Sequence, residues 1–175
     1  MSAHLIFKTR LVTSQEDWQI FEDLLRTYAA KDLDQPQHSS IWKDLDDLPA
    51  RYGQPNGSAI LLSHQAKPHA QGIVMGCGAL ARTQMSNACE IKRLFILAEY
   101  RGRGGSKVLI QDLLQRAQAQ GYDQAVLSTW KSNHTGLALY QNLGFQTVPS
   151  FKTHPNSELI FLGRSFTAAD AQKNS

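Results

Sequence analysis

The sequence has few of the features that mark several protein classes. Its 175 residues contain two cysteines, Cys77 and Cys89, with no C-x-x-C motif and no companion histidine spacing. This favours a reduced protein with buried thiols over a disulfide or zinc scaffold. An oxidised pair on neighbouring strands is the alternative. No apolar run approaches the length of a membrane span, and the N-terminus lacks the apolar core of a signal peptide. We therefore expect a cytoplasmic protein with no membrane contact and no bound metal.

The sequence also lacks a large excess of charge of either sign. The net charge of +3 is too small to indicate nucleic acid as a partner, and the positive charge is concentrated near one glycine-rich stretch. With 42% hydrophobic and 19% charged residues, the composition is ordinary for a globular protein, and the length fits one domain. We expect a single domain over residues 1–175, with a core at 3–166 and a frayed tail at 167–175.

The pattern of apolar residues predicts an α/β protein in the order β-α-α-β-β-β-α-β-α-β-β. Helix-start residues before Gln15 and apolar residues at helical spacing after it predict a first helix, and a second, short helix should end at Pro49. A longer helix over 106–120 should be capped by Gly121. The remaining predictions are strands at 5–9, 59–63, 73–80, 88–97, 125–128, 145–148 and 159–162, and a helix at 135–142.

The most informative stretch is residues 100–107, Tyr-Arg-Gly-Arg-Gly-Gly-Ser-Lys, between the strand at 88–97 and the helix at 106–120. Glycine lets backbone N–H groups turn toward a ligand, and a helix N-terminus adds partial positive charge, so the stretch suits a phosphate. It lacks the P-loop spacing, and Lys107 stands where a dinucleotide fingerprint has its third glycine. Unlike an RNA-binding arginine-glycine tract, it occurs once, between regular elements. What remains is the pattern Arg101-x-x-Gly104-x-Ser106.

That pattern resembles the acyl-coenzyme-A loop of the GCN5-related N-acetyltransferases (GNAT), [QR]-x-x-G-x-[GA]. Residues 133–145 read N-x-x-G-x-x-L-Y-x-x-L-G-F and resemble a second segment of the family, with Gly136 in place of its usual alanine. Residues 48–49, 89–94 and 143–145 are similar to a mostly uncharacterised bacterial subgroup. The resemblance covers residues 3–166 and implies a central mixed, mostly antiparallel sheet flanked by helices, with acetyl-CoA as cosubstrate.

The resemblance also implies which residues hold the coenzyme. The backbone N–H groups of the loop would surround the pyrophosphate, and a strand N–H at Leu94 or Ile96 would polarise the thioester carbonyl. Asn133 would hydrogen-bond the pantetheine arm, although asparagine also suits a helix cap. Ser106 is small and can cap a helix, but it could crowd a close backbone approach. The implied coenzyme-binding residues are Leu94, Ile96, Arg101, Gly102, Arg103, Gly104, Gly105, Ser106, Lys107 and Asn133.

Acetyl transfer to an amine further needs a base and an acid. Glu90 lies on the strand before the loop, where family members often carry a glutamate, and would take the ammonium proton directly or through water. Its alternative is a salt bridge to Lys92, Arg93 or another cation. Tyr140 would protonate the departing thiolate, because a phenol with a pKa of about 10 keeps its proton at neutral pH. Its alternative is a place in a core-facing stripe.

The acceptor is less constrained. Asp44, Asp46 and Asp47 could attract a cationic amine or form a solvated helix face, whereas Lys92 and Arg93 could bind an acceptor's carboxylate. We expect direct transfer from acetyl-CoA to the primary amine of a small molecule or amino acid. A protein or peptide N-terminus as acceptor and a non-catalytic coenzyme-A-binding regulator are the alternatives. The oligomeric state stays open, although an exposed sheet edge often makes such folds homodimers.

Overall fold

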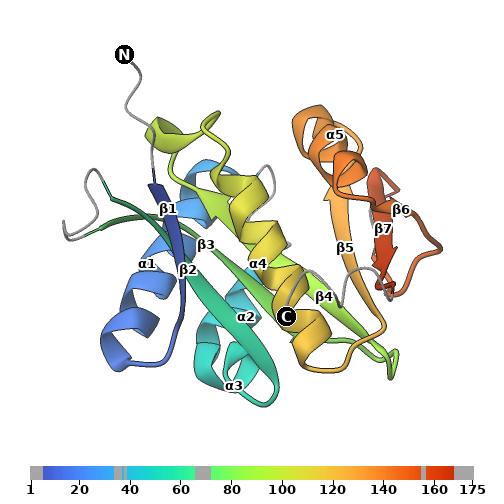
Figure 1. The fold of residues 1–175 in the computed structure, drawn as a ribbon, viewed down its shortest axis with the longest axis horizontal. Helices are drawn as coiled ribbons and strands as arrows, with labels where there is room; N and C mark the ends of the chain where they lie inside the picture. Colours follow the sequence, from blue (N-terminus) through green and yellow to red (C-terminus); the bar gives the residue numbers. More distant parts are fainter. Residues whose placement is uncertain (1–5, 34–36, 38, 66–71, 155–156, 168–175) are drawn as a thin grey trace. The chain divides into compact units, whose positions relative to one another are not determined.

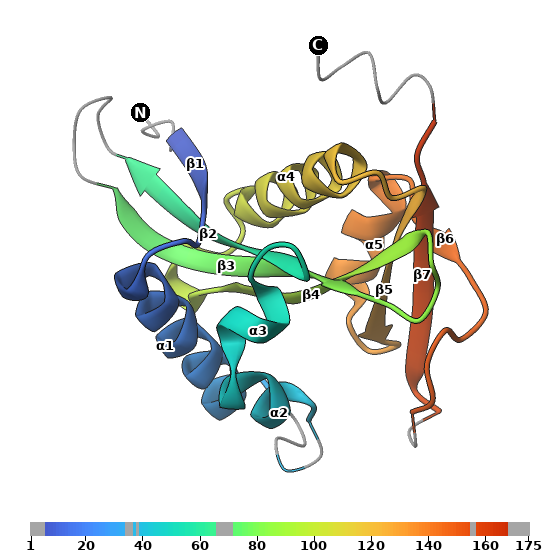
Figure 2. The same cartoon turned by 90° about the horizontal axis from the view of Figure 1, so that it is seen from below.

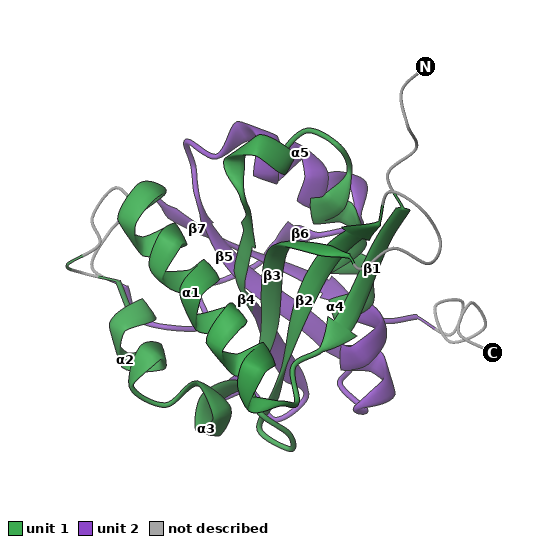
Figure 3. Cartoon of the chain, turned by 90° about the vertical axis from the view of Figure 1, so that its left-hand side faces the viewer, with its two compact units in different colours: residues 1–81, 92–113 green, residues 82–91, 114–175 purple. Residues whose placement is uncertain are grey.

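The computed structural model describes residues 6–33, 37, 39–65, 72–154 and 157–167. The chain forms two compact units (Figure 3): unit 1 comprises residues 1–81 and 92–113, and unit 2 comprises residues 82–91 and 114–175. The predicted base and acid, Glu90 and Tyr140, belong to unit 2, and the glycine-rich stretch belongs to unit 1. Of the predicted tail, residues 168–175 lie outside the described residues.

Unit 1 is built on antiparallel strands. Strand β1 (Ile6–Leu11) pairs with β2 (Gly57–Gln65), and β2 pairs with β3 (Ile73–Arg82), both antiparallel. Its fourth strand is the second part of β4 (Ala88–Ile96). The first six residues of β2 are all buried, as expected of a strand covered on both faces. Figure 2 shows α1, α2 and α3 on one face of these strands and the start of α4 on the other.

Helix α1 (Gln15–Lys31) follows the sequence prediction closely. The Ser14 hydroxyl accepts a hydrogen bond from the Asp17 backbone N–H at 3.1 Å and caps the helix. Phe21 and Leu25 are fully buried, one turn apart on the face that meets the core. Burying each such side chain stabilises the fold by about 1.5–3 kcal/mol.

Two short helices follow α1, where the sequence predicted one that ends at Pro49. They are α2 (Ile41–Asp46) and α3 (Leu48–Tyr52), and Pro49 lies in the first turn of α3. A proline fits there because its fixed φ is helical and its missing N–H has no partner to lose. The Asp47 carboxylate caps α3 by accepting from the Ala50 N–H at 3.0 Å. The predicted helix end was therefore wrong, since α2 ends at Asp46 and Pro49 lies in the first turn of the next helix.

Unit 2 combines parallel and antiparallel pairing. The first part of β4 pairs in parallel with β5 (Gln124–Trp130), and the helix between them is α4 (Gly105–Ala119), the kind of crossover that parallel strands need. Strand β7 (Leu159–Ser165) pairs antiparallel with both β5 and β6 (Gln146–Thr147). Helix α5 (His134–Asn142) joins β5 to β6.

Glycine ends α4 as the sequence predicted. Gly121 has a φ of +83°, a left-handed conformation that glycine adopts without steric cost. Beside it, the Tyr122 N–H donates to the Ala117 carbonyl at 3.1 Å and satisfies one of the last carbonyls of the helix.

The hydrogen-bonded strands of the described residues follow the order β1-β2-β3-β4-β5-β7-β6 (Figure 1). Strands β4 and β5 are parallel, whereas the pairs β1–β2, β2–β3, β5–β7 and β6–β7 are antiparallel. The predicted α/β class, with a mixed, mostly antiparallel sheet flanked by helices, is confirmed. The predicted order of elements holds once α3 is added.

Candidate functional site

The glycine loop, residues 101–107, has an open backbone. Gly102 and Gly104 adopt left-handed conformations, with φ of +74° and +90°. A Cβ at either position would have no atom within 4 Å, so both glycines face open space. The loop leads into α4, whose first N–H groups have no acceptor inside the helix and carry the positive end of its dipole. This backbone fits a phosphate group.

Gly105 has the opposite environment to its neighbours. It is buried, and a Cβ there would lie 2.9 Å from Leu62 Cδ2 and 3.0 Å from Ile96 Cδ1. The helix starts at Gly105, so Ser106 is exposed in the first turn and is not the capping residue that the sequence suggested. The position in this loop where a side chain would be crowded is therefore Gly105, and not Ser106.

The arginines of the loop bind the protein itself. Arg101 Nε donates to the Ile96 carbonyl at 2.8 Å, and its Nη2 binds the Asp32 carboxylate at the end of α1. Arg103 Nη2 donates to the Glu99 carbonyl at 3.2 Å. These side chains anchor the loop, which leaves its backbone, and the exposed Lys107, as the groups suited to hold a ligand.

Strand β4 changes its backbone direction just before the predicted carbonyl-polarising residues. Arg93 has a φ of +58°, which is uncommon for a residue other than glycine, and Leu94 follows it directly. Such a residue interrupts the alternation of side chains along a strand. Lys92 and Arg93, neighbours that would otherwise face opposite sides, accordingly both approach Asp44. The sequence carried no signal for this conformation.

The buried carboxylate of Asp44 is the centre of a group of residues that we call the Asp44 cluster: Asp44, Arg51, Tyr52, Lys92 and Arg93. The Asp44 side chain is 1% exposed, and its Oδ2 accepts from Arg93 Nε at 2.8 Å, from Arg93 Nη2 at 2.5 Å and from the Tyr52 hydroxyl. Lys92 Nζ lies 3.8 Å from Oδ2, and Arg51 Nε lies 3.2 Å from Oδ1.

The charges of this cluster set the ionisation of Asp44. Burial alone would raise the pKa of Asp44, but the positive charges of Arg93 and Lys92 and the hydrogen bonds outweigh it and lower the pKa. Asp44 is therefore an ionised internal partner of Arg93, and the prediction of a solvated aspartate face is wrong for it. Asp46 and Asp47 are exposed, and Asp47 caps α3.

Glu90 lies in the part of β4 that belongs to unit 2. It is 8% exposed, and its Oε1 accepts a hydrogen bond from Lys152 Nζ. Among the described residues, this lysine is the ion-pair partner of Glu90, whereas Lys92 and Arg93, the cations that the sequence suggested, approach Asp44. Lys152 was missed because it lies 62 positions away in the chain, outside any helix or strand.

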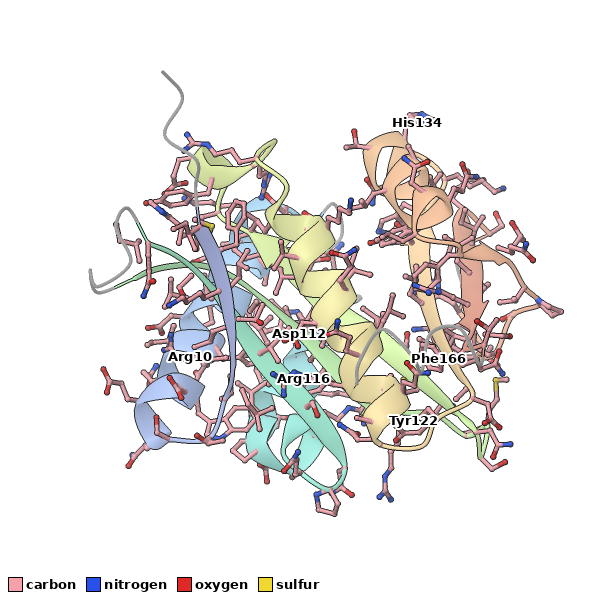
Figure 4. The ribbon with its side chains drawn as sticks, in the orientation of Figure 1. Arg10, Asp112, Arg116, Tyr122, His134 and Phe166 are labelled. Carbon is pink, nitrogen blue, oxygen red and sulfur yellow. The ribbon has the colours of Figure 1, made fainter. Side chains whose placement is uncertain are left out.

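Asn133 caps α5, immediately before His134, which Figure 4 labels at the start of that helix. Its Oδ1 accepts from the Gly136 N–H at 3.0 Å, and its Nδ2 donates to Thr129 Oγ1 at 3.0 Å. An asparagine amide has two N–H donors, so one bond to Thr129 leaves the second donor for a ligand. A Cβ at position 136 would lie 2.3 Å from Asn133 Nδ2, which explains why glycine accompanies this cap.

Tyr140 lies on α5 and is half-buried. Its ring meets that of the buried Phe145 edge-on, with centroids 5.9 Å apart. Packing of the ring and a reactive hydroxyl are compatible, because the phenol carries its polar group at the far end of an apolar body. Tyr140 belongs to unit 2, as Glu90 does.

The cysteines are poor nucleophiles. Both are free and buried. Burial raises the pKa of Cys89 to about 12 and that of Cys77 further, so little thiolate exists at neutral pH. Across the described residues, no group of three or more histidine, cysteine, aspartate or glutamate side chains is placed to hold a metal ion. None of the helices there combines the length and apolar character that crossing a membrane demands.

A family model described as acetyltransferase (GNAT) family matches residues 18–145. Rat N-acetyltransferase family 8 member 2 is 30% identical over 82% of this chain and 59% of its own length. N-acetylaspartate synthetase of Danio rerio is 28% identical over 70% of this chain and 44% of its own length. The chain spans 35% to 66% of the first four curated relatives that it matches.

The fold also matches solved structures. The PaiA N-acetyltransferase of Thermoplasma acidophilum, solved in complex with coenzyme A, superposes with a TM-score of 0.66 at 17% sequence identity. The match covers 92% of this chain and 99% of that protein, which shows that the two share a fold.

Proposed function

Because this chain belongs to the acetyltransferase (GNAT) family, we propose that it transfers an acetyl group from acetyl-CoA directly to the primary amine of a small molecule or amino acid. The observation that carries the proposal is the open glycine loop at the start of α4, in the position where the sequence resembles the family's acyl-coenzyme-A loop. A single acetyltransferase domain and a cytoplasmic location, which suits two free cysteines, belong to the same proposal.

The glycine loop is proposed to hold the coenzyme through its backbone. The N–H groups between Arg101 and Lys107 would bind the pyrophosphate, and Lys107 would add a positive charge. Arg101 serves indirectly, because its bonds to Ile96 and Asp32 fix where the loop begins. The N–H of Leu94 or Ile96 is proposed to bind the acetyl carbonyl, and Asn133 the pantetheine arm.

Glu90 is proposed as the base and Tyr140 as the acid. The Glu90 carboxylate already binds an ammonium group, that of Lys152, which supports the assignment of a protonated amine to this position. Removing one proton from the acceptor ammonium frees its lone pair to attack the thioester carbonyl. The Tyr140 hydroxyl then protonates the thiolate that leaves. The raised pKa values of both cysteines favour this direct transfer over a route through a cysteine.

A small amine or an amino acid is the acceptor that we favour. One matching relative is named for making N-acetylaspartate, an N-acetylated amino acid. The Asp44 cluster contributes no free carboxylate for a cationic acceptor, since Asp44 is bound by Arg93 and Tyr52. Glu90, whose partner Lys152 is partly exposed, is the carboxylate to which we assign the acceptor amine.

The test is a thiol-release screen of the purified protein with acetyl-CoA against amino acids, polyamines, aminoglycosides and peptides. We expect turnover with one class of amine, and a loss of about 100-fold or more in Glu90→Gln. Glu158→Gln is the matched control, because Glu158 also pairs with a lysine in unit 2 but is 64% exposed. If acetyl-CoA raises the melting temperature but no amine releases thiol, the protein is a coenzyme-binding regulator and the proposal fails.

A further inference from the structure

Lys152 occupies the position on Glu90 that the proposed function assigns to an acceptor amine. Its Nζ donates to Oε1 of a carboxylate that is 8% exposed. The lysine side chain itself is 33% exposed, so its ammonium group reaches the carboxylate while solvent still has access to it. An amine at hydrogen-bond distance from the base is the arrangement from which acetyl transfer begins.

The segment that carries Lys152 is held in place by local contacts. The Phe151 ring packs edge-on against Phe161 of β7, with centroids 5.1 Å apart. Lys152 Nζ lies 5.5 Å from the centroid of the Phe151 ring, and the Ser150 hydroxyl donates to the Lys152 carbonyl at 2.6 Å. These contacts hold the lysine near Glu90, which raises the effective concentration of its amine at the base.

We propose that Lys152 is an acetylation site of the protein itself, modified in the same molecule when acetyl-CoA is bound and no other acceptor is present. This inference rests on the proposed function of Glu90. One Lys152 proton passes to Glu90, and the Nζ lone pair forms a bond to the thioester carbonyl carbon. The carbon–sulfur bond breaks and a second proton leaves the nitrogen. Of the two protons released, one ends on the coenzyme-A thiol and the other in solvent, which leaves a neutral Nε-acetyl-lysine.

Lys131 is the matched reference for this reaction. It also pairs with a glutamate of unit 2, at 3.5 Å from Glu158, but both side chains are exposed, to 53% and 64%. We expect any acetylation of Lys131 by acetyl-CoA to be slow, because it would proceed without a buried base. We therefore expect Lys152 and Lys131 to be acetylated at different rates, even though each has a glutamate partner.

The experiment incubates the full-length protein with acetyl-CoA and follows the 42-Da addition of an acetyl group at each lysine by peptide mass spectrometry. We expect Lys152 to be modified about 100-fold faster than Lys131, and Glu90→Gln to bring its rate to that of Lys131. The rate at Lys152 should not depend on protein concentration. When isotope-labelled Glu90→Gln protein is mixed with unlabelled wild type, Lys152 of the labelled variant should be modified no faster than Lys131.

Three results would overturn the inference: equal rates at Lys152 and Lys131, a rate at Lys152 unchanged by Glu90→Gln, or modification of the labelled variant by the wild type. The thiol-release screen separates this failure from that of the proposed function. Turnover of an external amine with an unmodified Lys152 would remove the inference and keep the function. No turnover of any amine together with an unmodified Lys152 would remove both.

Discussion

Residues of strand β4 take part in two groups of ion pairs, which differ in burial and in the number of partners around the carboxylate. In unit 1, Lys92 and Arg93 approach an aspartate that is 1% exposed and that also receives the Tyr52 hydroxyl. In unit 2, Glu90 binds one lysine whose side chain is 33% exposed. A buried carboxylate whose Oδ2 accepts several hydrogen bonds stabilises a fold, whereas one held by a partly exposed ammonium group can exchange that group for a substrate.

The difference follows from desolvation. Two charges removed from water need good geometry and further hydrogen bonds to offset the cost, and the Asp44 cluster supplies both. The pair of Glu90 and Lys152 is exposed at its lysine end, so each group exchanges partners at low cost. The Asp44 cluster should therefore matter for stability, and Glu90 for turnover.

The largest effect should come from Glu90, the proposed base. Glu90→Gln is expected to lower kcat by about 100- to 10,000-fold, because it removes proton transfer while keeping the shape of the side chain. Its free energy of unfolding should fall by roughly 1 kcal/mol or less, since the pair is partly exposed. Steady-state kinetics and urea unfolding measure the two quantities. A large loss of stability with little loss of kcat would show that Glu90 is a structural residue.

The next effect concerns the Asp44 cluster. Asp44→Ala is expected to lower the free energy of unfolding by about 3–5 kcal/mol, because it leaves the Arg93 charge buried without its partner. Asp46→Ala is the matched control, since Asp46 is exposed at the end of α2. Chemical denaturation compares the two variants. Equal stability of both would contradict the structural role of the cluster.

A smaller effect should appear in the glycine loop. Gly104→Ala forces a left-handed backbone on alanine, at a cost of about 1–2 kcal/mol, and should weaken acetyl-CoA binding. Gly121→Ala carries the same strain at the end of α4, with open space around it, and should lower stability without changing coenzyme affinity. Calorimetric titration with acetyl-CoA measures the affinity of each variant. Unchanged affinity in Gly104→Ala would remove the loop from the binding site.

The smallest effect is a dependence on pH. The pKa of Asp44 is lowered from its ordinary 3.8, so its contribution to stability is complete above that value and is lost as the pH falls below it. As the pH falls below about 4, the wild type should lose more free energy of unfolding than Asp44→Asn, which has no carboxylate to protonate there. If the free energy of unfolding falls equally with pH in the two proteins, Asp44 does not cause this pH dependence.

Sequence patterns predicted the features that depend on nearby residues. Apolar periodicity located α1, and glycine at position 121 located the end of α4, because both signals lie within a few residues of the structure that they specify. Periodicity also predicted β4 and thereby placed Glu90 on a strand before the loop. The helix break at Pro49 was misread because proline both ends and begins helices.

The partners of the charged residues could not be predicted in the same way. Lys152 reaches Glu90 across 62 positions and comes from an irregular segment, for which no periodic signal exists. Arg93 turns toward Asp44 through a left-handed backbone that arginine rarely adopts. The residue types on β4 therefore indicated that its charged side chains would form ion pairs. Tertiary packing decided which carboxylate each cation meets.

We propose that Glu90 acts in catalysis and Asp44 in folding. The most direct test measures thiol release and unfolding free energy side by side for the wild type, Glu90→Gln and Asp44→Asn. We predict that Glu90→Gln loses turnover while it stays folded, and that Asp44→Asn loses most in stability. Thiol release by Glu90→Gln at the rate of the wild type, with a fold as stable, would contradict the account.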